Sequence, residues 1–94
     1  MYIRYYIGME LAWSEEKDVL LKATRGVSFR QVKAEIEAGR FLGPEVNPSR
    51  PGQFRIIVKL NDYPHIVPLV FTEDGAWFLK TIIPSRKAKK AGMP

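Results

Sequence analysis

The sequence predicts an α+β fold in which two N-terminal helices pack on one face of a small antiparallel sheet. Two stretches between residues 14 and 39 combine helix-capping residues with apolar residues at helical spacing. Three apolar stretches separated by turn residues follow between residues 53 and 83. The expected sheet is a three-stranded C-terminal meander plus one or two N-terminal strands. Residues 1–94 are expected to form a single domain, because 94 residues leave no room for a second core.

The N-terminal residues offer one or two strands and then a helix. Residues 10–13 favour a short strand, whereas residues 2–7 fit either a strand or a loosely held arm. Ser14 is a suitable N-cap, acidic residues follow it, and Gly26 is a suitable helix stop. We therefore expect the first helix over residues 15 to about 24. Its buried face is expected to contain Val19, Leu20 and Ala23.

A capping signature marks the start of the second helix. Ser28 and Gln31 have the spacing of a capping box, in which each side chain bonds the backbone N–H of the other residue. Gly39 is a suitable C-terminal stop. The buried face of this helix is expected to contain Phe29, Val32 and Ile36.

Residues 43–52 contain three prolines and two glycines, so a loop long enough to contact a partner is expected there. Pro68 lies inside the second of the three C-terminal strands and predicts a bulge or an exposed edge. The predicted strands cover residues 53–60, 65–71 and 76–83, with turns at residues 61–64 and 72–75.

Composition excludes several classes of protein. The chain has no cysteine, which excludes disulfides, thiolate metal sites and cysteine nucleophiles. No apolar run approaches the roughly 18 residues that a membrane span needs. The first residues lack the basic and apolar blocks of a secretory leader. A cytoplasmic protein with no membrane association is expected.

The net charge of +5 is concentrated in the second half of the chain. Residues 1–50 contain eight Lys or Arg and seven Asp or Glu, whereas residues 51–94 contain seven and three. The excess is densest in a basic tail at about residues 84–94. This asymmetry favours a polyanionic partner such as nucleic acid, or an acidic protein. The alternative is a solubilising tail with no partner.

Strand alternation predicts where the basic side chains of the sheet point. Arg55 and Lys59 alternate with apolar residues and should leave the core face. A hairpin closed at residues 72 and 75 would place Lys80 opposite Val67. Whether Lys80 shares the face of the other two cations then depends on the turn after the first of the three strands.

An odd-length loop after Leu60, or a bulge at Pro68, would put the cations on one face, whereas a two-residue turn at residues 62–63 would bury Lys80. Burial of an unpaired lysine is costly, so we expect one of the first two arrangements. The predicted open face carries Arg55, Lys59 and Lys80, with Arg86 and Lys87 arriving from the tail.

The chain contains limited machinery for acid–base chemistry. His65 is its one histidine, and imidazole titrates near neutral pH, so it is a candidate acid or base. The alternative is a structural hydrogen bond at a strand end. No residues have metal-ligand spacing, and no metal or cofactor is expected. RNA cleavage nevertheless needs few protein groups, because the 2′-hydroxyl is an internal nucleophile and cations stabilise the phosphorane.

Three short segments carry a family resemblance. Residues 13–17, Trp-Ser-Glu-Glu-Lys, resemble an F/W-D-x-x-K opening into a first helix. Residues 25–29, Arg-Gly-Val-Ser-Phe, resemble an H-G-V-S-F link into a second helix. Residues 82–88, Ile-Ile-Pro-Ser-Arg-Lys-Ala, are similar to an I-I-S-A-R-R-A segment after the last strand. Together they resemble the BrnT-type ribonuclease toxins of bacterial type II toxin–antitoxin systems, relatives of the RelE-like fold.

The resemblance implies a RelE-like fold and a small toxin that cleaves RNA without a metal and so inhibits translation and growth. It also implies a cognate antitoxin that neutralises the toxin, with operator DNA bound only through the antitoxin complex. Arg86 matches the arginine after the family's last strand and is assigned to phosphate stabilisation. Arg25 stands where the family usually has a histidine, and the family's acidic and tyrosine ending is absent.

The leading hypothesis is a cytoplasmic endoribonuclease toxin that acts on mRNA, either single-stranded or ribosome-associated. One alternative is a non-catalytic nucleic-acid-binding module, and another is a protein-interaction module that uses the same basic face. For Arg55 and Lys59, an ordinary solvated strand face is the alternative to RNA contact. The candidate catalytic residues are Lys80, Arg86, His65 and Arg25, and the candidate RNA-binding residues are Arg55, Lys59, Ser85, Lys87 and Lys89.

Overall fold

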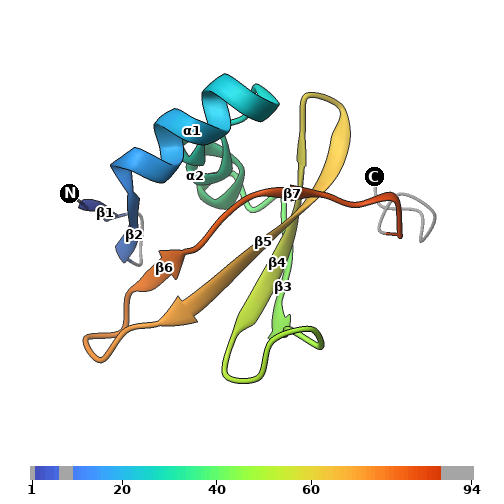
Figure 1. The fold of residues 1–94 in the computed structure, drawn as a ribbon. Helices are drawn as coiled ribbons and strands as arrows, with labels where there is room; N and C mark the ends of the chain where they lie inside the picture. Colours follow the sequence, from blue (N-terminus) through green and yellow to red (C-terminus); the bar gives the residue numbers. More distant parts are fainter. Residues whose placement is uncertain (1, 7–9, 88–94) are drawn as a thin grey trace.

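The computed structural model describes residues 2–6 and 10–87 (Figure 1). Two strands come before the two helices in the chain, and the other strands of the sheet come after them. Its helices and strands are β1 (Tyr2–Tyr6), β2 (Glu10–Ser14), α1 (Glu15–Arg25), α2 (Phe29–Glu37), β3 (Leu42–Val46), β4 (Phe54–Leu60), β5 (Tyr63–Phe71), β6 (Trp77–Leu79) and β7 (Ile83–Pro84).

The six longer strands form one sheet in the order β1-β2-β6-β5-β4-β3, and the two-residue β7 pairs with β5. The α+β class, the two N-terminal helices and the C-terminal antiparallel strands are confirmed. The expectation of a wholly antiparallel sheet is wrong, because β2 runs parallel to β6. Antiparallel neighbours can be joined by short turns, whereas this parallel pair is joined through both helices and three further strands.

β3 is a strand that the sequence did not predict. It occupies part of the segment of residues 43–52 that was expected to be a loop, and it pairs with β4 at the sheet edge. All five of its residues are exposed, so it lacks the buried apolar face that reveals a strand in a sequence. The remaining loop, residues 47–53, connects β3 to β4.

α1 begins and ends as its capping residues predict. The Ser14 hydroxyl accepts a hydrogen bond from the backbone N–H of Lys17, and Gly26 ends the helix in the left-handed region at φ 66°. Its buried face differs from the prediction, because the buried residues are Asp18 and Leu21. The residues that were expected to be buried are exposed: Val19 (57%), Leu20 (51%) and Ala23.

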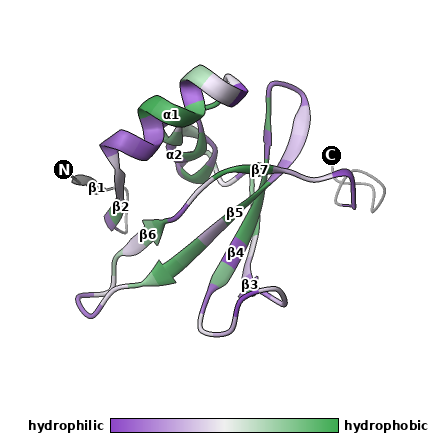
Figure 2. Cartoon of the chain, viewed as in Figure 1, coloured by the Kyte–Doolittle hydropathy of each residue, from purple (hydrophilic) through white to green (hydrophobic). Residues whose placement is uncertain are grey.

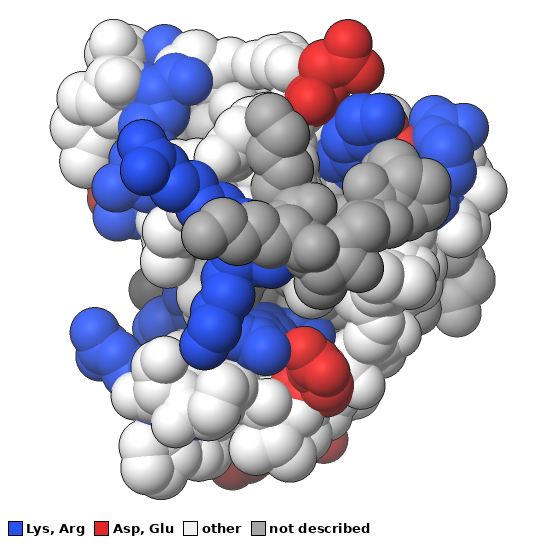
Figure 3. Space-filling model, turned by 90° about the vertical axis from the view of Figure 1, so that its right-hand side faces the viewer, with Lys and Arg blue, Asp and Glu red and all other residues white. Residues whose placement is uncertain are grey.

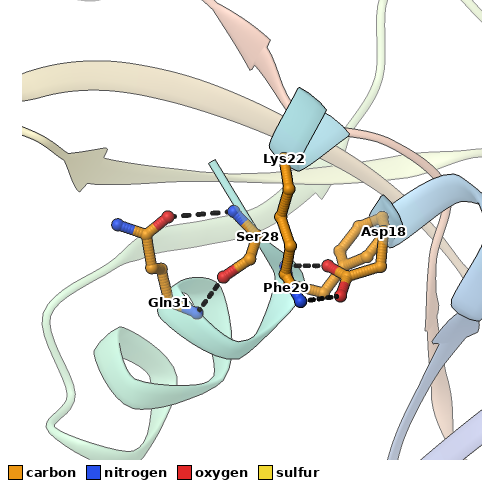
Figure 4. A network of polar contacts seen from close by, with 5 residues as sticks. All are labelled: Asp18, Lys22, Ser28, Phe29 and Gln31. Carbon is orange, nitrogen blue, oxygen red and sulfur yellow. Dashed lines mark hydrogen bonds and ion pairs between the residues drawn. The ribbon is translucent and has the colours of Figure 1, made fainter. Parts of the chain in front are cut away.

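The orientation of α1 follows from a polar contact that fixes the start of α2 (Figure 4). The carboxylate of Asp18 accepts a hydrogen bond from the Phe29 N–H (2.8 Å) and pairs with the Lys22 ammonium (3.1 Å). The predicted capping box between Ser28 and Gln31 is confirmed beside it. The helix face that presents a buried carboxylate to α2 is therefore the one that faces inward.

The core lies between the helices and one face of the sheet. Trp13 of β2 stacks on Phe29 at the start of α2, with ring centroids 5.7 Å apart. Hydrophobic residues lie along β4, β5 and β6, and polar residues dominate the turns (Figure 2). The predicted buried face of α2 is confirmed. The core comprises Leu11, Trp13, Leu21, Val27, Phe29, Val32, Ile36, Ile56, Val58, Leu60, Val67, Leu69, Leu79 and Ile82.

Pro68 lies inside the sheet, which corrects the expectation of a bulge or an exposed edge at this position. It is buried in β5 opposite Arg55 of β4, with no break in the β4–β5 register, and its carbonyl accepts a hydrogen bond from the Lys80 N–H (2.8 Å). β5 thus continues through the proline. Within the described residues, no helix is long and apolar enough to cross a membrane.

Candidate functional site

Three predicted cations project from the same face of the sheet, the one opposite the helices. Arg55 and Lys59 alternate with the buried residues of β4. Arg55 pairs with Pro68 of β5, and the Lys80 N–H bonds the Pro68 carbonyl, so Arg55 and Lys80 lie in one row across the strands. The expectation that these cations share a face is therefore confirmed.

The turns that produce this arrangement differ from those predicted. The β4–β5 turn has two residues, Asn61 and Asp62, because Leu60 pairs with Tyr63. The β5–β6 hairpin closes at Phe71 and Trp77, not at residues 72 and 75. This change in closure shifts β6 by one residue, which turns Lys80 from the core face to the open face.

A pocket of about 460 Å³ lies on this face. Four cations line it from four separate segments: Lys17 of α1, Arg50 of the β3–β4 loop, Arg55 of β4, and Lys80 after β6. In Figure 3, Lys and Arg side chains lie on the left of the view and at its upper right, and fewer Asp and Glu side chains are visible. The other lining residues are Asn47, Ser49, Gln53, Ile66, Pro68, Thr81 and Ile83.

The cations of this pocket differ in how far they are neutralised. The Arg55 guanidinium bonds the Glu45 carboxylate (2.8 Å) across the β3–β4 pair. The Lys80 ammonium lies 5.5 Å from the centroid of the Phe78 ring, a cation–π contact. Lys17, Arg50 and Lys80 form no ion pair with any carboxylate of residues 10–87. Three of the four charges are thus available to an anionic ligand.

Sequence reasoning missed Lys17 and Arg50. Lys17 enters the pocket because α1 follows β2, and β2 ends beside the end of β6 through their parallel pairing. The sequence gives no sign of that pairing. Arg50 had a usable signal, because it lies between Pro48 and Pro51 in a segment already interpreted as a partner-contacting loop.

Lys59 shares the face of Lys80 but lies away from the cationic pocket. Its ammonium is 3.7 Å from the carboxylate of Asp62 in the β4–β5 turn. It lines a different hollow of about 630 Å³, together with Glu35, Gly39, Arg40, Phe41, Leu42, Asn61 and Asp62.

His65 points to the opposite side of β5 from Lys80. It pairs with the core residue Val58 and is buried, and its Nδ1 lies 2.7 Å from the Tyr63 carbonyl oxygen. Because a carbonyl only accepts, Nδ1 carries the proton and Nε2 is free to act as an acceptor. Burial lowers the pKa of His65, and the positive charge of Arg25 lowers it further, against the opposing effect of the Tyr63 carbonyl. The imidazole is therefore neutral at pH 7.

Arg25 and the end of β7 enclose the region around His65. The Arg25 guanidinium donates a hydrogen bond to the Ile82 carbonyl (2.6 Å). Pro84 pairs with His65, and the Ser85 N–H bonds the Pro64 carbonyl (3.0 Å). Ser85 is buried, Arg86 and Lys87 are exposed, and Lys89 lies outside the described residues.

The predicted site residues therefore do not form one cluster. Arg55 and Lys80 belong to the cationic pocket, whereas His65 lies on the helix side of β5 with Arg25 near it. The row of Lys80 contains Pro68, which lies three positions after His65 in β5, or roughly 10 Å along the strand. Among the described residues, no group of three or more His, Cys, Asp or Glu could hold a metal ion.

Comparison of the chain with models of protein families, with curated protein sequences and with solved structures gave no significant match.

Proposed function

We propose that this protein is a ribonuclease toxin that binds RNA across the cationic pocket and the adjoining end of β7. The pocket is the observation that carries the proposal, because three of its four cations have no carboxylate partner within residues 10–87. When clustered lysines and arginines bind a nucleic acid, they mostly contact its phosphodiester groups. The resemblance of residues 13–17, 25–29 and 82–88 to BrnT-type toxins supports the choice of RNA and of a RelE-like relationship.

The proposed reaction is transesterification within the RNA. The 2′-oxygen attacks the adjacent phosphorus, the bond from phosphorus to the 5′-oxygen breaks, and the products are a 2′,3′-cyclic phosphate and a 5′-hydroxyl. A base removes the proton of the 2′-hydroxyl, and an acid gives a proton to the departing 5′-oxygen. Cations around the phosphorus stabilise the charge that accumulates in the transition state.

Lys80 and Arg86 are the proposed phosphate contacts in this reaction. His65 is the proposed proton acceptor, which its neutral state and unprotonated Nε2 support. Arg25 adds positive charge beside it. Since Lys80 and His65 lie on opposite sides of β5, the RNA would have to cross the exposed β7 edge to meet both. Flanking phosphates are assigned to Arg55, Lys59, Ser85, Lys87 and Lys89.

A growth assay tests the proposal. Induction of the wild-type gene in a bacterial host should arrest growth and produce RNA fragments with 2′,3′-cyclic phosphate ends. Arg86→Ala and Lys80→Ala should each relieve the arrest while the protein stays folded. Arg40→Ala is a matched control, because it also removes an exposed arginine but at the other hollow, where Arg40 pairs with Glu35. Undiminished toxicity of both Arg86→Ala and Lys80→Ala would refute the assignment.

The proposed partner is a cognate antitoxin that covers the basic face and represses their shared operon as a complex. Co-expression with the neighbouring reading frame should yield a stable complex and restore growth. If the neighbour neither binds nor protects, the toxin–antitoxin part of the proposal fails, whatever the activity on RNA.

A non-catalytic nucleic-acid-binding module is the second candidate function, and one observation favours it. Among the described residues, the lining of the cationic pocket contains no histidine, aspartate or glutamate, so this lining offers no group of the usual acid–base type. Purified protein that binds RNA with a steep salt dependence, yet leaves it intact with and without ribosomes, would support this candidate. A protein-interaction module would instead bind an acidic partner and show no RNA affinity.

A further inference from the structure

The cationic pocket has an apolar floor as well as charged walls. Arg55, Pro68 and Lys80 form one row across the open face, and Ile66 and Ile83 form the neighbouring row. Ile83 is 40% exposed although it is a large hydrophobic residue. The floor therefore offers apolar surface to a ligand directly beside the cations.

The pocket also contains a mostly buried amide whose donor is open to the pocket. Asn47 is 6% exposed and lines the pocket. Its Oδ1 accepts a hydrogen bond from the Ser49 N–H (3.1 Å), which identifies the remaining amide atom as the nitrogen Nδ2. Nδ2 has no hydrogen-bond partner among residues 10–87. Nδ2 itself keeps contact with solvent, so it can donate to an acceptor of a ligand in the pocket.

Three properties of the pocket together describe one kind of ligand. The volume of about 460 Å³ lies within the range of small-molecule sites. The cations favour an anionic group, the floor favours a flat or apolar group, and Nδ2 can donate to an acceptor. A nucleotide has all three, in its phosphate, the face of its base, and the ring or carbonyl acceptors of the base edge.

We propose that this pocket is a nucleotide subsite that holds one unstacked nucleotide of single-stranded RNA. The base lies on Ile66 and Ile83, Asn47 donates to its edge, and the phosphate meets Lys17, Arg50 and Lys80. This deepens the proposed function and rests on RNA being the ligand. A base inside a duplex cannot reach the floor, so the subsite requires single-stranded RNA.

Binding of 2′-O-methyl RNA tests the subsite separately from cleavage, because this RNA lacks the nucleophilic hydroxyl. A short fluorescein-labelled single strand, the matching duplex and inorganic polyphosphate are compared by fluorescence anisotropy. Wild-type protein should prefer the single strand over the duplex at the same salt concentration. Ile83→Ala should weaken single-strand binding roughly fivefold and leave polyphosphate binding unchanged, because it removes only floor contacts. Leu20→Ala, which shortens an exposed apolar residue on α1, should change neither.

A second variant tests the donor of Asn47. Asn47→Asp keeps the acceptor for the Ser49 N–H and replaces the donor by an oxygen, so single-strand affinity should fall by about tenfold or more. Gln31→Glu makes the same charge change while preserving the acceptor of its capping box, and it should have a much smaller effect.

Equal affinity for single strand and duplex, or normal single-strand binding by Ile83→Ala, would overturn the subsite. Wild-type protein that still arrests growth and cuts RNA in that case would leave the proposed function intact. If the wild-type protein binds no RNA at all, both proposals fail.

Discussion

Asp18 shows how a single buried carboxylate can connect two helices. Its oxygen accepts the hydrogen bond of the Phe29 N–H, and both groups are buried. Asp18→Ala leaves that N–H without an acceptor, so the free energy of unfolding should fall by about 1–3 kcal/mol, as measured by urea denaturation. Asp18→Asn retains an acceptor and should lose less.

Lys22→Ala is the matched control for Asp18. It removes the ion pair but leaves the hydrogen bond to Phe29, and the Lys22 side chain is half exposed. The expected loss is at most about 1 kcal/mol. Equal losses for Lys22→Ala and Asp18→Ala would show that the ion pair, and not the backbone hydrogen bond, provides the stabilisation.

His65 should make the stability of the protein depend on pH in a defined direction. Its pKa is lowered from the ordinary value of 6.5 in the folded protein, mainly by burial. Below pH 6.5 the unfolded chain therefore binds a proton more readily than the folded protein does. The free energy of unfolding should fall as the pH drops from 6.5 towards the folded-state pKa, and it should not depend on this group above 6.5. In His65→Gln this component of the pH dependence should disappear.

Arg25→Ala provides a direct test of the charge beside His65. Removal of the guanidinium should raise the pKa of His65 towards its ordinary value, because a nearby positive charge disfavours the imidazolium. His65 is the one histidine of the chain, so its imidazole resonances can be followed by NMR without ambiguity. Arg40→Ala should leave the titration unchanged. An unshifted midpoint in Arg25→Ala would mean that Arg25 does not contribute to the lowered pKa.

In the β4–β5 turn, the backbone conformation is unfavourable for one of the two turn residues. Asn61 and Asp62 have φ values of 51° and 64°, both in the left-handed region. A two-residue hairpin turn of this kind favours Asn followed by Gly. Asp62→Gly should therefore stabilise the protein by up to about 1 kcal/mol, because it removes the cost of the left-handed conformation.

Asp62→Ala is the comparison for that turn. It removes the same carboxylate, and with it the contact to Lys59, but keeps a Cβ, so it should be no more stable than the wild-type protein. Both variants are measured by urea denaturation. A gain in both would show that the carboxylate, and not the backbone conformation, is unfavourable.

The helices could be predicted from the sequence because their signals are local. Ser14, Gly26 and the Ser28–Gln31 box each act within four residues, and all of them cap helix ends as expected. The buried face of α1 could not be predicted, since it depends on the acceptor that Asp18 provides for Phe29, eleven residues away.

The sheet and the candidate site depended on information that is not local. Alternation correctly placed Arg55 and Lys59 away from the core. The position of Lys80 depended on how two successive turns close, and a one-residue difference at either turn reverses it. Lys17 joined the pocket only through a parallel strand pair, for which no signal exists in a single sequence.

At the scale of the whole molecule, the net charge of +5 should give RNA binding a strong dependence on salt. Each phosphate neutralised on a single strand contributes roughly 0.7 to the slope of log affinity against log salt concentration. Lys80→Gln should reduce that slope by about this amount. Arg55→Gln should reduce it less, because Glu45 already neutralises the Arg55 charge. Equal changes in the slope for Lys80→Gln and Arg55→Gln would show that Glu45 does not make the Arg55 charge less available to RNA.

The parallel pairing of β2 with β6 has a consequence for when the pocket can exist during synthesis. Lys17 emerges from the ribosome early, but the wall that faces it includes Lys80 and is made much later. A growing chain therefore lacks the complete cation cluster until its C-terminal strands are free to join the sheet. The proposed toxin would in this way remain inactive on the ribosome that is making it.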